Sequence, residues 1–142
     1  MVKYPTGNKV KTVRAKHNPP KNKYFNHMTR AHGYVFDSAV EMHYYEHLCT
    51  LKLNFKYHEK FEIIPRKVSS WGKTYQHRIY TPDFSIYDDK GNLQEVVDVK
   101  GGKATMTADS SLRMAEFINR YDVPVVIATW NRQTKTFDEK YK

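Results

Sequence analysis

The fold is set by residues 80–101, which read YTPDFSIYDDKGNLQEVVDVKG. Two runs of strand-forming residues, 83–87 and 93–100, flank the turn sequence DDKGN. This arrangement predicts an antiparallel hairpin, because Asp, Asn and Gly readily adopt the backbone conformations that reverse a chain. Side chains alternate between the two faces of a strand, so Asp98 and Lys100 should point the same way while the valines beside them face the core.

The segments around the hairpin predict an α/β fold with one mixed sheet. Apolar residues recur every three or four positions over 39–52, which predicts a helix with Ser38 as its N-cap. A second helix is expected over 107–120, and the last dozen residues should be peripheral. Strands are predicted over three further segments, 55–64, 74–80 and 123–130. Helices should therefore flank a central mixed sheet.

The net charge of +9 is concentrated near the N-terminal end. Residues 1–36 contain eight Lys or Arg and no Asp or Glu, whereas the remainder has sixteen basic and fifteen acidic residues. We expect a basic, extended or partly disordered arm over 1–35 and a single domain over 36–142. Such an arm attracts nucleic acid, although a solvated tail is the simpler alternative. The residues expected to contact DNA are Lys9, Lys11, Arg14, Lys16, Lys21, Lys23 and Arg30, with Lys103 and Arg113 outside the arm.

Composition excludes several classes of protein. No apolar run is long enough for a membrane-spanning helix, and no apolar signal segment follows Met1. The single cysteine, Cys49, excludes an internal disulfide and a Cys-rich zinc site. This cysteine usage is typical of a reducing compartment, so we expect a cytoplasmic protein with no membrane partner.

The predicted hairpin brings acidic residues together. Asp83 begins one strand and Asp98 lies near the end of the other, so both carboxylates should meet beside Lys100. Adjacent carboxylates repel each other where solvent is restricted, and Mg²⁺ or Mn²⁺ would remove this conflict. A neighbouring lysine can orient water for phosphodiester hydrolysis. The alternative is a solvated surface hairpin, but charged residues are depleted from buried strands.

Glu41 is the fourth candidate. It lies at the margin of the apolar face that Val40 and Tyr44 define, from which it can reach the end of the sheet. Alternatively, Ser38 and Glu41 form a capping box, in which the carboxylate bonds back to the Ser38 backbone N–H. The two roles are compatible, since fixing the start of the helix would also fix the acid.

Taken together, Glu41, Pro82-Asp83 and Asp98-x-Lys100 resemble the signature of the PD-(D/E)xK nucleases. The predicted order of elements is similar to the αβββαβ core of their restriction-endonuclease-like fold. The stretches around these residues resemble a family of small phage-encoded proteins that are described as of unknown function or as endonucleases. This resemblance implies an Mg²⁺-dependent DNA endonuclease, with Mn²⁺ able to substitute, acting in recombination or packaging inside an infected bacterium.

The resemblance also implies roles for individual residues. The implied metal ligands are Asp83, Asp98, the Val99 carbonyl and Glu41, the last as a further or second-metal ligand. Lys100 would position the attacking water, and Arg113 on the following helix would assist. Branched DNA is one substrate within this fold group, and its resolution would require a homodimer.

Two other functions remain open from the sequence. His43-Tyr44-Tyr45-Glu46-His47 matches the H-x-x-E-H string of inverted zinc proteases, with Glu116 as an available third ligand. A basic arm has no role in that mechanism. The other alternative is a DNA-binding protein without catalytic activity, since Tyr and Lys interleave over residues 3–25 in a way that suits single-stranded or branched nucleic acid.

Overall fold

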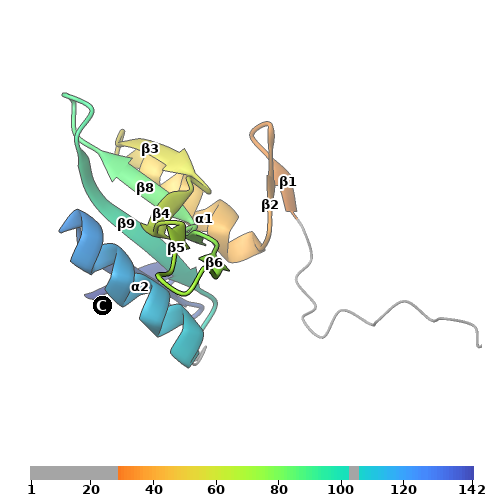
Figure 1. Ribbon diagram of the computed structural model, residues 1–142. Helices are drawn as coiled ribbons and strands as arrows, with labels where there is room; N and C mark the ends of the chain where they lie inside the picture. The colour runs from red at the N-terminus through yellow and green to blue at the C-terminus, as the bar shows by residue number, and fades with distance from the viewer. Residues whose placement is uncertain (1–28, 103–105) are drawn as a thin grey trace, which may run out of the picture.

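The computed structural model describes residues 29–102 and 106–142. These residues form two helices, α1 (Ala39–Thr50) and α2 (Ala108–Tyr121), and eleven strands (Figure 1). The strands are β1 (Thr29–Ala31), β2 (Tyr34–Phe36), β3 (Asn54–Tyr57), β4 (Phe61–Ile64), β5 (Lys67–Val68), β6 (Thr74–Tyr75), β7 (Arg78–Tyr80), β8 (Phe84–Tyr87), β9 (Leu93–Lys100), β10 (Val125–Asn131) and β11 (Thr136–Tyr141). Neither helix has the length and apolar character needed to cross a membrane.

Five strands form the central sheet, in the order β11-β10-β9-β8-β3. Strands β9 and β10 are parallel and are joined through α2, whereas the other three neighbouring pairs are antiparallel. The mixed sheet and its helices confirm the predicted α/β class. Along the chain, α1, β3, β8, β9, α2 and β10 follow one another in an αβββαβ order, and the short strands β4 to β7 are inserted after β3.

The predicted hairpin is confirmed as β8 and β9. The two strands are antiparallel, with Phe84 opposite Val97. At the turn, the Asp88 carboxylate accepts a hydrogen bond from the backbone N–H of Asn92 at 2.8 Å, and Gly91 has a φ of 83°. The turn residues therefore do what their chemistry predicts, since Asp bonds to its own turn and Gly adopts the left-handed conformation without strain.

A helix covers each face of the sheet, as Figure 1 shows. Val96 and Val97 are both fully buried in β9 but belong to different apolar clusters, because adjacent residues of a strand face opposite sides. The cluster of Val97 includes Tyr44 of α1, and the cluster of Val96 includes Phe117 of α2. Strand β9 is thus buried on both faces, so any charge on it lies in a restricted solvent environment.

The start of α1 is fixed by the predicted N-cap. The Ser38 hydroxyl accepts a hydrogen bond from the backbone N–H of Glu41 at 3.2 Å. This bond satisfies one of the N–H groups that have no partner inside the helix. The N-cap therefore fixes the positions of Asp37, directly before Ser38, and Glu41, in the first turn of α1.

Two predicted strands are each divided in the structure. The strand predicted over 55–64 is β3 and β4, because His58 adopts a left-handed conformation with φ of 53° that interrupts extended backbone. After this break the chain leaves the central sheet, and β4 pairs with β7. The segment 74–80 likewise contains two strands, β6 and β7, which pair with different partners.

The two ends of the described chain also differ from expectation. The last dozen residues include β11, which pairs with β10 along its length, and Phe137 packs against the cluster beneath α1. At the other end, the expected arm over 1–35 finishes in an ordered hairpin of β1 and β2, with His32 and Gly33 at its turn. Residues 1–28 of the arm lie outside the described residues.

Candidate metal centre

Asp83 lies directly before β8 and follows the fully buried Pro82. Its Oδ2 accepts a hydrogen bond from the backbone N–H of Val99 at 2.6 Å. Its backbone carbonyl accepts a hydrogen bond from the N–H of His58 at 3.0 Å. These bonds hold Asp83 between the end of β9 and the break that follows β3.

Asp98 and Lys100 lie together at the end of β9. The distance between Asp98 Oδ2 and Lys100 Nζ is 2.5 Å, and Asp98 is only 9% exposed. Burial and the nearby charge of Asp83 raise the pKa of the Asp98 carboxyl, although Lys100 acts in the opposite direction. The hairpin therefore brings Asp83, Asp98 and Lys100 together as expected, and negative charge between the two carboxylates is incompletely offset.

Glu41 projects from the first turn of α1 and is 8% exposed. Its Oε2 accepts a hydrogen bond from the Tyr57 hydroxyl at 2.7 Å, and its Oε1 accepts one from the Ser38 hydroxyl at 3.2 Å. The carboxylate is thus fixed by two hydroxyl groups instead of by the Ser38 N–H of a capping box. Burial and the charge of Asp83 raise the pKa of Glu41.

His58 and Asp37 belong to the same cluster but were not predicted. The Nε2 atom of His58 lies 3.5 Å from Glu41 Oε2, 3.7 Å from Asp83 Oδ1 and 3.9 Å from Asp37 Oδ2. The interaction with Asp83 is the largest cause that raises the pKa of His58, and the charges of Glu41 and Asp37 add to it. The left-handed conformation of His58 takes it out of the strand pattern, so periodicity gives no sign of this position.

Tyr80 supplies a buried hydroxyl near the carboxylates. The residue is 5% exposed, and its hydroxyl has no hydrogen-bond partner within the described part of the chain. Burial, followed by the charges of Asp98 and Asp83, raises the pKa of this hydroxyl, which therefore remains a protonated donor. Leaving a buried donor without a partner is costly, so a bound water or ligand that accepted this hydrogen bond would be favourable.

Two neighbouring groups of side chains lie at this end of the sheet, and Asp83 belongs to the first and borders the second. The Asp83–Asp98 site comprises Asp83, Asp98 and Lys100. The Asp37–His58 site comprises Asp37, Glu41 and His58, whose ligand atoms all lie within 4.8 Å of one another. Carboxylate oxygen and imidazole nitrogen are both ligands for divalent metal ions.

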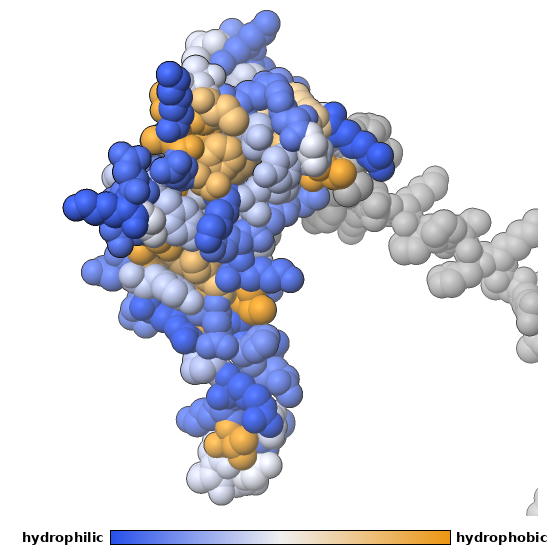
Figure 2. All heavy atoms as spheres, turned by 90° about the horizontal axis from the view of Figure 1, so that it is seen from above, coloured by the Kyte–Doolittle hydropathy of each residue, from blue (hydrophilic) through white to orange (hydrophobic). Residues whose placement is uncertain are grey.

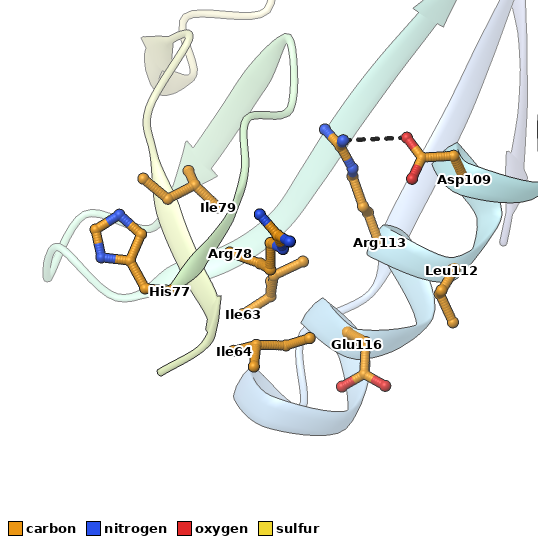
Figure 3. Close-up of a pocket in the computed structure, with 9 residues that line it drawn as sticks. All are labelled: Ile63, Ile64, His77, Arg78, Ile79, Asp109, Leu112, Arg113 and Glu116. Atoms are coloured by element: carbon orange, nitrogen blue, oxygen red, sulfur yellow. Dashed lines mark ion pairs between the residues drawn. The ribbon is translucent and has the colours of Figure 1, made fainter. Parts of the chain in front are cut away.

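Of the basic residues expected to contact DNA, two lie in the described chain. Arg30 is an exposed residue of β1. Arg113 forms an ion pair with Asp109 at 3.1 Å and lines a groove of about 600 Å³ between α2 and the β4–β7 pair, where Figure 3 shows it pointing toward Asp109. Among the described residues, no ion pair or hydrogen bond joins Arg113 to Asp83 or Asp98. The other seven basic residues expected to contact DNA lie outside the described residues: Lys9, Lys11, Arg14, Lys16, Lys21, Lys23 and Lys103.

A basic projection carries exposed aromatic rings. Strands β5 and β6 form a small hairpin whose four strand residues are all exposed. Figure 1 shows this hairpin in front of the sheet, and the view from above in Figure 2 shows a narrow projection from the body. Trp71, in its turn, is 72% exposed, and residues 65–78 contain no acid. The basic residues of segment 65–78 are Arg66, Lys67, Lys73 and Arg78, the last of which begins β7.

The H-x-x-E-H residues of α1 have other partners. The ring of His43 stacks on Trp130 at 4.9 Å, and the Glu46 carboxylate pairs with His32 at 3.1 Å. Glu116 lines the groove beside α2, on the opposite face of the sheet from α1. The described residues contain a single group of three or more potential metal ligands, and it includes none of these side chains.

The fold and the site define a small α/β protein with a cluster of carboxylates, one histidine and one lysine at the end of a mixed sheet. Residues 21–141 match the family described as a protein of unknown function, DUF1064, and the chain belongs to this family. No curated protein and no solved structure matches the chain.

Proposed function

We propose that this protein is a metal-dependent DNA endonuclease of the PD-(D/E)xK type, built on a restriction-endonuclease-like fold. The observation that carries the proposal is the close approach of Asp83 and Asp98 at the end of one hairpin, with Lys100 Nζ 2.5 Å from Asp98 Oδ2. The αβββαβ order of the surrounding elements supports the proposed fold.

The residues of the Asp83–Asp98 site fit Mg²⁺. Oxygen ligands suit this ion, and a divalent charge would offset the repulsion and burial that raise the pKa of Asp98. The unpaired hydroxyl of Tyr80 would be satisfied by a water molecule at the site. The proposed ligands are Asp83, Asp98 and the Val99 carbonyl, with Glu41 as a further or second-metal ligand. A bound Mg²⁺ or Mn²⁺ would polarise the phosphate and lower the pKa of water.

The protein itself would supply orientation and positive charge. Lys100 holds an ammonium group beside Asp98, where it can orient the attacking water and stabilise negative charge that develops on the phosphate. The hydrogen bond from the Val99 N–H fixes Asp83 before any ligand binds. Such pre-organisation lowers the cost of reaching the reactive geometry.

Two basic surfaces would hold the DNA. The arm over 1–35 carries a positive charge that favours the phosphate backbone. The β5–β6 hairpin and the residues beside it add Arg66, Lys67 and Lys73 together with the exposed ring of Trp71, on which an unpaired base can stack. Base stacking at an exposed tryptophan favours single-stranded or branched DNA over a regular duplex.

The test is cleavage of linear, single-stranded and four-way-junction DNA by the purified full-length protein. We expect nicking or cutting with Mg²⁺ or Mn²⁺, and no activity with EDTA. Asp83→Asn should abolish cleavage, whereas Asp138→Asn, which alters an exposed acid of β11, should not. Full activity in EDTA, or in Asp83→Asn, would exclude the proposed mechanism.

A DNA-binding protein without catalytic activity is the second candidate, and the basic excess of residues 1–36 favours it. This candidate predicts salt-dependent binding of DNA with no cleavage under any metal condition. The same set of substrates therefore separates the two functions.

A further inference from the structure

The Asp37–His58 site has a composition different from that of the Asp83–Asp98 site. It joins an imidazole to two carboxylates, and no lysine or arginine of the described residues forms an ion pair with either acid. Asp37 is exposed, Glu41 is buried and His58 is half-buried, so one side of the group is open to solvent. An ion could enter from that side without displacing a structural element.

The distances in this group are those between neighbouring ligands of a metal ion. The Nε2 atom of His58 lies 3.5 Å from Glu41 Oε2 and 3.9 Å from Asp37 Oδ2. Both distances exceed the range of about 2.7–3.2 Å that is typical of an N–H···O hydrogen bond. Two neighbouring ligands bound at about 2.1 Å lie about 3.0 Å apart at an octahedral ion and about 3.4 Å apart at a tetrahedral one, so the side chains would need to approach by less than about 1 Å.

The backbone and the neighbouring side chains hold these ligands in place. His58 has a φ of 53°, its N–H is bonded to the Asp83 carbonyl, and its ring stacks on Tyr57 at 3.8 Å. The Tyr57 hydroxyl in turn donates to Glu41 at 2.7 Å. A positive φ is costly for a residue with a side chain, and such strain at a non-glycine position is a feature of functional sites.

We propose that Asp37, Glu41 and His58 form a second divalent-cation site, which binds Mn²⁺ or another transition metal in preference to Mg²⁺. The preference follows from the imidazole ligand, since nitrogen suits transition metals whereas Mg²⁺ requires oxygen. Asp83, whose Oδ1 lies 3.7 Å from His58 Nε2, borders both sites. The inference deepens the proposed function by giving the nuclease two unlike metal sites, but metal binding here does not itself depend on DNA cleavage.

The competing explanation is that a protonated His58 neutralises its acidic neighbours and no ion binds. Counting bound Mn²⁺ on the full-length protein by electron paramagnetic resonance distinguishes the two. Two variants remove the imidazole and tolerate a positive φ at this position, His58→Asn and His58→Gly. His77→Ala is the matched control, because it alters an exposed histidine that pairs with Glu62 and is not a member of the Asp37–His58 site.

We expect two Mn²⁺ ions per wild-type chain and per His77→Ala chain. Both His58 variants should lose one ion or bind it at least about tenfold more weakly, because loss of a direct ligand should cost no less than loss of an outer-shell partner. Their affinity for Mg²⁺ should change less. Asp98→Asn should lose the other ion and keep the one that depends on His58.

Equal Mn²⁺ stoichiometry and affinity in the wild type and both His58 variants would overturn the proposal, and so would a single wild-type ion that Asp98→Asn removes. A protein that cleaves no DNA but binds Mn²⁺ through His58 would retain this site and lose the proposed nuclease function. If DNA cleavage and metal binding are both unchanged in the His58 variants, the nuclease proposal is retained and the Asp37–His58 site is refuted.

Discussion

Adding Mg²⁺ should reverse the order of thermal stability of the wild type and the Asp98→Asn variant. The substitution keeps the shape of the side chain and removes its charge. Because burial and Asp83 raise the pKa of Asp98 in spite of Lys100, the folded state as a whole disfavours the ionised carboxylate. Without metal, the variant should therefore be at least as stable as the wild type at neutral pH.

The sign of this effect follows from proton linkage. A raised folded-state pKa means that the folded protein holds the proton on Asp98 more tightly than the unfolded chain does. The stability of the metal-free wild type should then fall as pH rises from the ordinary pKa of about 3.9 through the raised folded value. Asp98→Asn should lack this decrease.

Bound Mg²⁺ should instead stabilise the folded wild type, and the size of this stabilisation can be calculated. A ligand at about 100 times its Kd stabilises the folded state by about 2.7 kcal/mol. For a chain of this length, about 3–4 °C per kcal/mol gives an increase in Tm of about 8–11 °C. The wild type should show this increase with Mg²⁺, whereas Asp98→Asn should show a much smaller one.

Thermal unfolding followed by circular dichroism, in EDTA and in Mg²⁺, measures both effects, with Asp138→Asn as the control. A Tm of Asp98→Asn below that of the wild type in EDTA would show that the carboxylate stabilises the fold. A full Mg²⁺-dependent increase in the variant would show that Asp98 is not a ligand.

Four further outcomes are expected. Residues 1–28 carry seven Lys or Arg, so their removal should reduce the slope of log K for DNA binding against log salt by up to about six. An unchanged slope would show that these residues do not contact DNA phosphates. Trp71→Ala should weaken binding of single-stranded DNA by about tenfold in fluorescence anisotropy without changing Tm, since stacking is worth about 1–3 kcal/mol per base. Glu46→Gln should leave metal-dependent DNA cleavage intact, whereas loss of cleavage in this variant would show that the proposed site is not sufficient without Glu46. Glu95→Gln should increase stability to urea at pH 7 but not below the pKa of Glu95, because burial and the charge of Glu139 raise that pKa.

The elements that the sequence predicts well are those with a strong local pattern. The apolar spacing after Ser38 predicts α1, and the turn sequence around Gly91 predicts the β8–β9 hairpin. By contrast, β11 reads TFDEKY and is mostly polar, because it is an edge strand that buries only part of one face. Its place in the sheet depends on contacts distant in sequence, among them a hydrogen bond from Tyr44 to Glu139 at 2.7 Å.

The same distinction applies to the candidate site. Asp83, Asp98 and Lys100 follow from strand alternation and one turn, so their proximity is predictable. Asp37 and His58 lie outside any regular element, and only the tertiary fold brings them together. A positive φ at a non-glycine position has no signature in hydrophobic periodicity, which is why the imidazole was missed.

Because both acids of the Asp83–Asp98 site come from one hairpin, the length of its turn controls whether the site exists. The side-chain period of a strand is two, so a slip of one residue would rotate Asp98 from the α2 face of the sheet to the α1 face. Inserting or deleting one residue between Asp88 and Asn92 would thus separate the acids even where the strands still paired. Natural variation in this loop should accordingly be confined to changes that preserve the pairing of Phe84 with Val97.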